Sequence, residues 1–222
     1  MNFDLTSESR PALSGFAIRT ATSEHHDCAT RLVNRCYADR GYINSLLSIQ
    51  HEDAMTICSA FQGERTVGTI GVRFESMRGL NADVVFESEL TELRAGGLTL
   101  CEFSRLAVDH DARDNKAVLA RLFHLAYLHA HRLAGCELLV IEVNPRHVAF
   151  YRRMLGFKVC SEPRLNPRVN AMAVLMSLDL AWGSEQIARF GGQPELLATT
   201  RTLYPHFYSP ADEAAMLARL LQ

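Results

Sequence analysis

Apolar and polar positions change their spacing along the chain in a way that predicts strands alternating with helices. Continuous or alternating apolar runs predict strands over residues 16–22, 55–62, 66–75, 98–108, 137–143, 157–160 and 170–179. Apolar positions at helical spacing predict helices over residues 23–40, 83–94, 113–133 and 144–155. Residues 1–14 look like a loose lead-in, 42–53 a mixed connector and 162–169 a loop. Strands and helices in turn through the middle of the chain indicate an α/β layered fold.

The composition narrows the function classes. Of the 222 residues, 48% are apolar and 22% are charged, which is ordinary for a globular protein. A net charge of −2 leaves no basic excess for phosphates, which argues against a nucleic-acid partner. No apolar run approaches the roughly 20 residues of a membrane helix, and the N-terminus does not resemble a signal peptide. Six scattered cysteines without a Cys-x-x-Cys pair fit a reducing cytoplasm better than a disulfide or zinc site.

The predicted strand over residues 98–108 holds the most informative polar side chains. Glu102, Ser104 and Arg105 interrupt it, and buried charges are costly unless they are paired or functional. Asp109-His110-Asp111 follows as a helix-start signal. On a regular strand residues 102 and 104 share one face while residue 105 points to the other. Cooperation between Glu102 and Arg105 therefore requires either a β-bulge near Ser104 or partners on opposite faces of the sheet.

Four groups of residues carry a family resemblance when their order and spacing are taken together. They are Arg35-Cys36-Tyr37 with Gly41-Tyr42, Glu102-Phe103-Ser104-Arg105-Leu106-Ala107-Val108, Asn144-Pro145-Arg146-His147 with Phe150-Tyr151, and Val169-Asn170-Ala171. The chain thereby resembles the N-acyl amino acid synthases of the GNAT acyltransferase superfamily. The resemblance covers roughly residues 15–181. It implies a three-layer α/β/α fold with a central mixed, splayed β-sheet, followed by a C-terminal helical extension over residues 182–222.

The resemblance implies transfer of a long-chain fatty-acyl group to the amine of an amino acid by direct attack on a thioester. Because the amine is mostly protonated, it needs a base, and Glu102 is the candidate, with Ser104 as a hydrogen-bonding neighbour. Arg73 and Arg105 are candidates for binding the carboxylate of the acceptor. Backbone N–H groups are expected to bind the oxyanion around Leu106, Ala107 and Val108. The substrate pocket is expected to include Asn144, His147, Phe150 and Tyr151.

The start of the predicted helix near residue 113 bears on the acyl donor. GNAT enzymes that use coenzyme A have glycines here, which let backbone N–H groups approach the pyrophosphate, whereas this chain has Lys116 and Val118. We therefore expect acyl-phosphopantetheine on acyl carrier protein as the donor and no resident cofactor, with acyl-CoA as the alternative donor. An acidic carrier protein would meet a basic surface formed by Arg113, Lys116, Arg146, Arg152 and Arg153.

Other interpretations remain open at this point. Glu102 could form an ion pair with Arg73 or Arg105 that only stabilises the fold. The protein could be an acyl-homoserine lactone synthase or a coenzyme A-dependent N-acetyltransferase, since both share parts of the pattern. It could also be a non-catalytic module that binds an acyl carrier or a lipid. The histidines at 124, 129 and 131 have the wrong helical spacing for zinc, so no metal is expected.

The predicted extension over residues 182–222 has two helical patches, around residues 184–190 and 210–221. It is too apolar for a free tail. It could cover a fatty-acyl tunnel, pack on the core or pair with a second chain, and the oligomeric state stays open.

Overall fold

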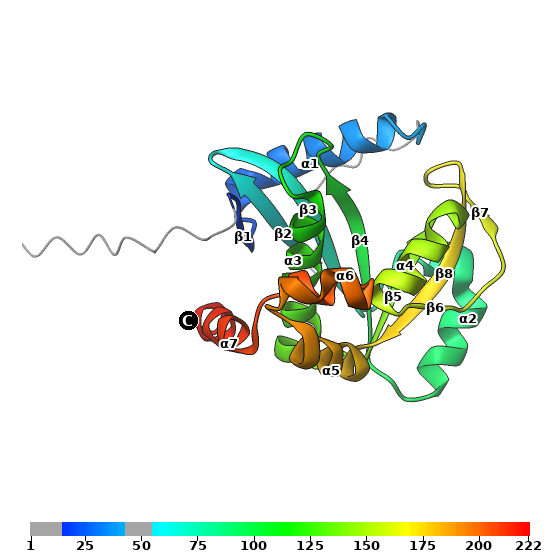
Figure 1. Ribbon diagram of the computed structural model, residues 1–222. Helices are drawn as coiled ribbons and strands as arrows, with labels where there is room; N and C mark the ends of the chain where they lie inside the picture. The colour runs from blue at the N-terminus through cyan, green and yellow to red at the C-terminus, as the bar shows by residue number, and fades with distance from the viewer. Residues whose placement is uncertain (1–14, 43–54) are drawn as a thin grey trace, which may run out of the picture.

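A single eight-stranded sheet forms the centre of the computed structural model, which describes residues 15–42 and 55–222 (Figure 1). Its order is β1-β2-β3-β4-β5-β8-β6, and β7 pairs with β8. The strands are β1 (Ala17–Thr20), β2 (Met55–Gln62), β3 (Arg65–Phe74), β4 (Leu100–Val108), β5 (Leu138–Val143), β6 (Lys158–Val159), β7 (Arg164–Asn166) and β8 (Ala171–Asp179). The expected lead-in over residues 1–14 and the connector beyond residue 42 lie outside the described residues.

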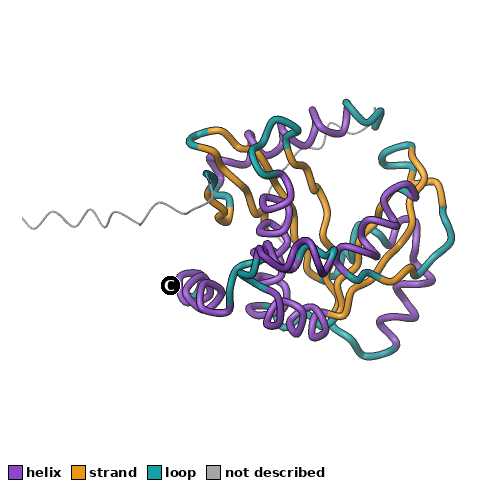
Figure 2. The backbone as a smooth tube through the Cα atoms, viewed as in Figure 1, coloured by secondary structure: helices purple, strands orange, loops and turns teal. Residues whose placement is uncertain are grey.

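The sheet is mixed and splayed, as predicted. Among the described strands only β4 and β5 pair in parallel, and all other pairs are antiparallel. The parallel ladder joins residues 100–102 of β4 to residues 138–140 of β5 and then stops. Beyond Glu102, β4 diverges from β5, which leaves a gap between the two strands in the middle of the sheet (Figure 2).

Helices cover both faces of the sheet, which gives the predicted three layers. Helices α1 (Ser23–Ala38) and α2 (Asp83–Ala95) lie on one face, and α3 (Asn115–Tyr127), α4 (Val148–Leu155) and α5 (Leu180–Phe190) lie on the other (Figure 1). Alternation along β5 shows this directly, because Val140 belongs to the core under α2 while Leu139 and Ile141 belong to the core under α3. The remaining helical segments are η1 (Leu128–Leu133), η2 (Pro145–His147), η3 (Pro194–Leu196), α6 (Leu197–Thr200), η4 (Tyr204–His206) and α7 (Pro210–Leu220).

One sequence prediction about these elements is wrong. The expected loop over residues 162–169 contains β7, which pairs with β8. The helix predicted over residues 113–133 is confirmed, because α3 and η1 together run from Asn115 to Leu133, with a change to a π-helix after Tyr127. Its N-cap is Asp114, whose side chain accepts the N–H of Ala117, so the Asp109-His110-Asp111 signal does not cap the helix.

The C-terminal extension packs on the core, which is one of the three options that the sequence left open. Leu180, Ile187, Leu203, Tyr204 and Phe207 belong to the same buried cluster as the inner face of α3. Figure 1 shows α5 and α6 over this face of the sheet, with α7 beside α3 at the edge. Within residues 15–42 and 55–222, no helix has the length and apolar character needed to cross a membrane.

Candidate active site

The β-bulge near Ser104 is present on β4. Two residues, Arg105 and Leu106, stand opposite the single residue Ile70 of β3, because Thr69 faces Ala107 and Gly71 faces Ser104. Arg105 has a φ of 52°, a conformation that side chains other than glycine adopt at a cost. The bulge changes which face each following side chain points to. It therefore brings residues 104–106 together at one cleft.

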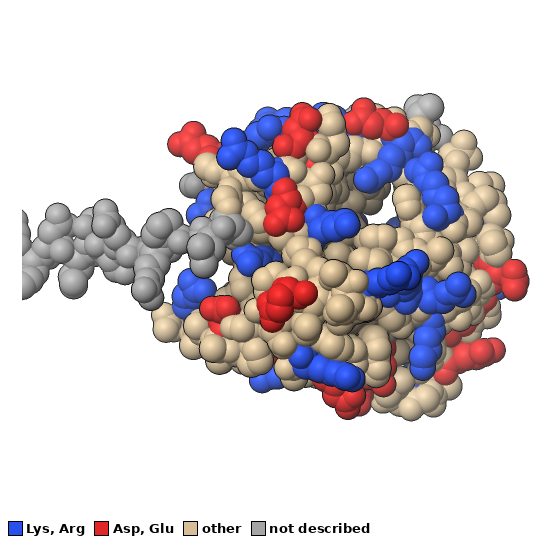
Figure 3. All heavy atoms as spheres, viewed as in Figure 1, with Lys and Arg blue, Asp and Glu red and all other residues tan. Residues whose placement is uncertain are grey.

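Two adjoining pockets of about 180 and 130 Å³ form this cleft. Both are lined by Tyr37, Tyr42, Phe103, Ser104, Arg105, Glu142, Val143 and Asn144. The space-filling view shows a hollow in this face with basic side chains along part of its rim, where β4 diverges from α4 and β8 (Figure 3). The cleft thus coincides with the gap that the splayed strands leave in the sheet.

Glu102 is the buried carboxylate of the cleft, with only 1% of its surface exposed. Its Oε2 atom accepts the backbone N–H groups of Asn81 at 2.6 Å and Ala82 at 3.2 Å. Burial raises the pKa of Glu102 to about 7, and the nearby carboxylate of Glu142 contributes to the rise. The guanidinium of Arg168 and the two N–H groups oppose the rise. A carboxyl with a pKa near neutrality can gain and lose a proton under physiological conditions.

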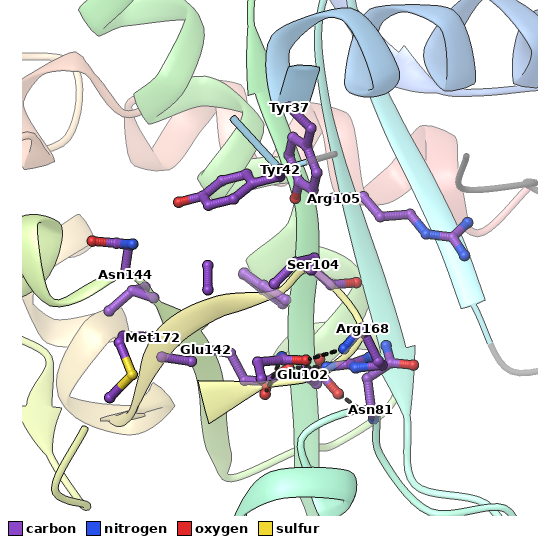
Figure 4. Close-up of a pocket in the computed structure, with 16 residues that line it drawn as sticks. Tyr37, Tyr42, Asn81, Glu102, Ser104, Arg105, Glu142, Asn144, Arg168 and Met172 are labelled. Atoms are coloured by element: carbon purple, nitrogen blue, oxygen red, sulfur yellow. Dashed lines mark hydrogen bonds and ion pairs between the residues drawn. The ribbon is translucent and has the colours of Figure 1, made fainter. Parts of the chain in front are cut away.

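Glu142 and Arg168 join Glu102 in the same pocket, and sequence reasoning missed both (Figure 4). Glu142 of β5 forms an ion pair with Arg168 and accepts the side-chain N–H of Asn166 at 3.0 Å. Burial raises the pKa of Glu142, and Arg168 works against this rise. Two signals were available in the sequence: a carboxylate inside the apolar stretch over residues 137–143, and an arginine directly before Val169-Asn170-Ala171.

Most of the predicted site residues of β4 reach the cleft, but their arrangement differs from the expectation. Ser104 and Arg105 line both pockets and Leu106 lines one. The guanidinium of Arg105 points away from Glu102, and Arg168 occupies the position near that carboxylate (Figure 4). Among the described residues, Ala107 and Val108 are not part of either pocket lining. Ala107 instead packs against α1.

Arg73 lies directly opposite Glu102 in the β3–β4 ladder, yet it does not line either of the two pockets among the described residues. The expected contact of Arg73 with an acceptor carboxylate is therefore not supported by the lining of the cleft. Its neighbour across the strand, Glu102, is turned toward Asn81 and Arg168 instead (Figure 4).

The residues predicted from the group Asn144-Pro145-Arg146-His147 with Phe150-Tyr151 lie partly inside and partly outside the cleft. Asn144 lines both pockets and caps the following turn, since its side chain accepts the N–H of Arg146. His147 and Tyr151 line the second pocket, whereas Phe150 is 37% exposed and lies outside both pocket linings among the described residues. Burial and the neighbouring Arg146 lower the pKa of His147, so its imidazole is neutral at pH 7.

Three tyrosines gather on the other side of the cleft. Tyr37 and Tyr42 make an edge contact with ring centroids 5.6 Å apart, and both line the second pocket together with Tyr151. Burial raises the pKa of Tyr37 to about 12 and that of Tyr151 further above its ordinary value. The hydroxyl groups of Tyr37 and Tyr151 therefore stay protonated and can act as hydrogen-bond donors. Tyr37 and Tyr42 belong to the segment that carried the family resemblance.

The expected donor-binding side presents its cations to solvent. Arg113, Lys116, Arg146, Arg152 and Arg153 are all exposed. At the start of α3, Val118 is fully buried, so only Lys116 of the two replaced glycine positions projects outward. The carboxylate of Asp114 already accepts an N–H at this helix start. A negative charge in that place disfavours a pyrophosphate.

A second buried carboxylate lies at the far end of β4 and belongs to a different environment. Asp109 is 1% exposed and binds Arg35 at 2.6 Å and Arg65 at 2.5 Å. It also accepts the N–H of Asp111 at 3.1 Å. These hydrogen bonds and charges hold the pKa of Asp109 below its ordinary value against the effect of burial. The helix-start signal seen in the sequence is thus a buried ion pair.

The three helix histidines have separate partners. His124 contacts Glu213, the side chain of His129 lies 2.8 Å from the hydroxyl of Thr20, and His131 lies 2.8 Å from the carbonyl of Cys136. Each imidazole therefore contacts a different segment of the chain.

Comparisons with known proteins identify the family of this chain. The family model of the N-acyl amino acid synthase FeeM matches residues 28–179. The structure of FeeM, an N-acyl amino acid synthase from uncultured soil microbes, superposes with a TM-score of 0.69 at 26% identity, over 77% of this chain and 93% of that chain. No curated protein sequence matches the chain.

Two more distant structures share the fold. The AHL synthase LasI has a TM-score of 0.55 at 12% identity, over 75% of this chain and 91% of that chain. An N-acetyltransferase from Staphylococcus aureus Mu50 has a TM-score of 0.52 at 15% identity, over 75% of this chain and 98% of that chain. Because the family match spans more than half of the chain, the protein belongs to the FeeM family of N-acyl amino acid synthases and is an acyltransferase.

Proposed function

We propose that this protein transfers a long-chain fatty-acyl group from acyl carrier protein to the amino group of an amino acid. The observation that carries this proposal is Glu102, a buried carboxyl with a pKa of about 7 at the gap between β4 and β5. A base with such a pKa is suited to take a proton from an ammonium group near neutral pH. FeeM itself is described as an N-acyl amino acid synthase.

The two substrates approach the gap from opposite faces of the sheet. Glu102 and Phe103 are consecutive on β4, so their side chains point to opposite faces. Glu102 lies beside the loop that leads into α2, whereas Phe103 packs against Phe123 of α3 with ring centroids 5.9 Å apart. The acceptor amine thus belongs on the polar side with Glu102, and the acyl chain belongs on the apolar side with Phe103. The thioester carbonyl would sit in the gap between them.

The charges around Glu102 suit an ammonium group. Glu102 and Glu142 carry two negative charges when both are ionised, and Arg168 supplies one positive charge in the same pocket. Buried charges are stable only when they are balanced. The ammonium of an amino acid would supply the missing positive charge. Arg105, which lines both pockets, stays the candidate for the carboxylate of the acceptor.

The reaction follows from this placement. Glu102 takes one proton from the ammonium, and the free amine then attacks the thioester carbon and forms the C–N bond. The oxyanion is held by backbone N–H groups near Leu106, on the side of β4 that no longer pairs with β5. The C–S bond breaks, one of the two protons left on nitrogen passes to the departing phosphopantetheine thiolate, which leaves as the thiol, and the other proton stays on the amide nitrogen. No acyl-enzyme is formed, and Ser104 has only a hydrogen-bonding role.

The choice of acyl carrier protein over coenzyme A rests on the start of α3. Asp114 and Lys116 stand where a pyrophosphate would need close, uncovered N–H groups. A phosphopantetheine arm carries one phosphodiester and needs less from this helix end. The exposed cations Arg146, Arg152 and Arg153 give an acidic carrier protein a matching surface.

Lipid analysis of a bacterial host that overproduces the protein tests the proposal. Mass spectrometry should find new N-acyl amino acids with the wild type, and their masses identify the acceptor and the chain lengths. With Glu102→Gln we expect the rate to fall by roughly two to four orders of magnitude, the usual contribution of a general base. Acyl-homoserine lactones as the only product would contradict the amino acid acceptor. An equal yield from both strains would remove Glu102 from the mechanism.

A further inference from the structure

An apolar chamber lies behind the cleft, on the α3 face of the sheet. Phe103 and Phe123 line both the second pocket of the cleft and this chamber, so they form the boundary between the two spaces. The other walls are Tyr127, Leu139, Leu155, Leu178, Leu180, Gly183, Ile187, Tyr204 and Phe207. The only polar atoms among these side chains are tyrosine hydroxyls, and that of Tyr204 donates to the carbonyl of Leu155 at 2.8 Å. Such a chamber suits a hydrocarbon chain and offers nothing to a polar ligand.

The far wall of the chamber comes from the C-terminal part of the chain. Leu180, Gly183 and Ile187 belong to α5, and Tyr204 and Phe207 belong to the turn that follows α6. The family match ends at residue 179, so all five wall residues lie beyond it. The inner walls on β4, β5 and α3 lie within the matched region. The matched region therefore forms the walls of the chamber next to the cleft, and the C-terminal part forms the wall at its far end.

Specific contacts hold this wall in place. His124 of α3 is fully buried, and its Nδ1 accepts the N–H of Tyr208 at 3.0 Å while its Nε2 donates to Glu213 at 3.0 Å. The N–H of Leu203 donates to the carbonyl of Met154 at 2.9 Å. These bonds tie the C-terminal part to both α3 and α4, so the wall is a fixed boundary.

Trp182 adds a packing contact that only glycine permits. Gly156 ends α4 with a φ of 81°, and a Cβ atom there would lie 2.2 Å from the Trp182 ring. The indole therefore rests directly on the backbone at this corner. Trp182 also meets Tyr204 edge-on with ring centroids 6.0 Å apart. The contact locks α5 against α4 beside the chamber.

We propose that the C-terminal segment from Leu180 to Phe207 closes the end of the acyl-chain site and sets the longest fatty-acyl chain that the enzyme transfers. This inference rests on the proposed function for its substrate. The chamber has a volume of about 20 Å³, enough for one water-sized group. It therefore receives only the end of a chain that has already passed Phe103 and Phe123. An acyl chain longer than this limit would clash with Ile187 and Tyr204 of the wall.

Gly183 offers a way to shorten the chamber without disturbing its frame. A Cβ atom at this position would meet only Leu178 Cδ2, at 3.9 Å, which is ordinary contact distance. The residue is buried inside α5, where a side chain also favours the helix. Gly183→Leu should fill the space from the wall side, and Ile187→Ala should enlarge it. Ala181→Leu is the matched control, because Ala181 is an exposed position on the same helix.

The test uses the purified full chain, the acceptor amino acid found in the lipid analysis, and acyl carrier protein charged with saturated chains of increasing length. For Gly183→Leu we expect kcat/KM to fall only for the longest chains, by roughly fourfold for each methylene that no longer fits. Ile187→Ala should move the preference toward longer chains, and Ala181→Leu should keep the wild-type profile. Equal losses at every chain length, or unchanged profiles in both chamber variants, would overturn the inference.

A binding measurement separates this inference from the proposed function. Trp182 is the only tryptophan in the chain and lies next to Gly183, so its fluorescence reports on the chamber wall. Titration with free saturated fatty acids should change the emission for chains that reach the wall, with the length threshold lowered by Gly183→Leu. If the wild type makes no N-acyl amino acid but this threshold moves, the proposed function fails and the role of the wall stands. A threshold that does not move contradicts the role of the wall.

Discussion

The two ends of β4 each carry a carboxylate that is 1% exposed, yet the two groups behave in opposite ways. Burial and Glu142 raise the pKa of Glu102 to about 7, whereas hydrogen bonds and two arginines keep the pKa of Asp109 below its ordinary value. Equal solvent exposure thus accompanies opposite shifts of the pKa, because Glu102 lies deeper in the protein than Asp109 and because their partners differ. Arg35 and Arg65 give Asp109 two direct ion pairs, while Arg168, the guanidinium that opposes the rise at Glu102, is bound to Glu142.

This difference indicates that Asp109 is a structural carboxylate and Glu102 a reactive one. Asp109 is fully satisfied and has no reason to exchange a proton. Glu102 is held by two backbone N–H groups but shares its surroundings with a second negative charge. A group that is stabilised only in part in either protonation state is suited to proton transfer. The sequence shows both carboxylates at a buried strand, and only their neighbours distinguish them.

The largest expected effect concerns the ionisation of Glu102. Its pKa rises from 4.5 to about 7 on folding, which corresponds to roughly 3 kcal/mol. Since the folded state binds this proton more tightly, the contribution is fully present below pH 4.5 and is lost as the pH rises through about 7. Urea unfolding measured across this pH range should show the loss of stability for the wild type and not for Glu102→Gln. Parallel pH curves for the two proteins would mean that Glu102 is not perturbed.

Asp109→Asn should lower the free energy of unfolding by about 2 kcal/mol at neutral pH, because two arginines lose their common partner. The value is below the range of about 3–5 kcal/mol for a fully buried ion pair, since Arg35 and Arg65 are 54% exposed and solvent screens them. With its lowered folded-state pKa, Asp109 contributes stability above its ordinary pKa, and this is lost as the pH falls through the folded pKa. Chemical denaturation of the wild type and Asp109→Asn at neutral and at acidic pH measures this loss, and the difference between the two proteins should be smaller at acidic pH.

Acyl transfer by the folded Asp109→Asn protein should match the wild type when rates are compared per active molecule. This sharpens the contrast with Glu102→Gln, which loses rate without a matching loss of stability. A loss of transfer in Asp109→Asn that exceeds its loss of folded protein would place the far end of β4 in the mechanism.

The smallest expected effects are opposite shifts of the acid limb of the pH–rate profile. Glu142→Gln removes a charge that raises the pKa of Glu102, so the limb should move to lower pH. Arg168→Gln removes a charge that lowers it, so the limb should move to higher pH. Arg164→Gln is the control, because Arg164 pairs with Glu89 on α2 and should leave the limb in place. Shifts in the same direction for Glu142→Gln and Arg168→Gln would show that the two residues act only through packing.

Local patterns were sufficient for most of the fold. Apolar spacing predicts β2, β3, β4, β5 and β8 and the helices between them, because each element buries one face or both in a regular way. The sequence left a β-bulge near Ser104 open as one of two arrangements, and the bulge is present. Its expected role is wrong, because Arg105 points away from Glu102 (Figure 4). The short strand β7 escaped prediction, as its three residues pair with β8 and have little pattern of their own.

What the sequence by itself determined is the layered fold, the polar residues of β4 and the kinship with acyltransferases, because these depend on periodicity and on motifs within one stretch of chain. Only the tertiary structure decided which charge stands beside Glu102. Arg168 follows Glu102 by more than sixty positions and Arg105 by three, yet the bulge turns Arg105 away while the β7–β8 connection brings Arg168 in (Figure 4). Electrostatic interactions depend on distance in space and not along the chain.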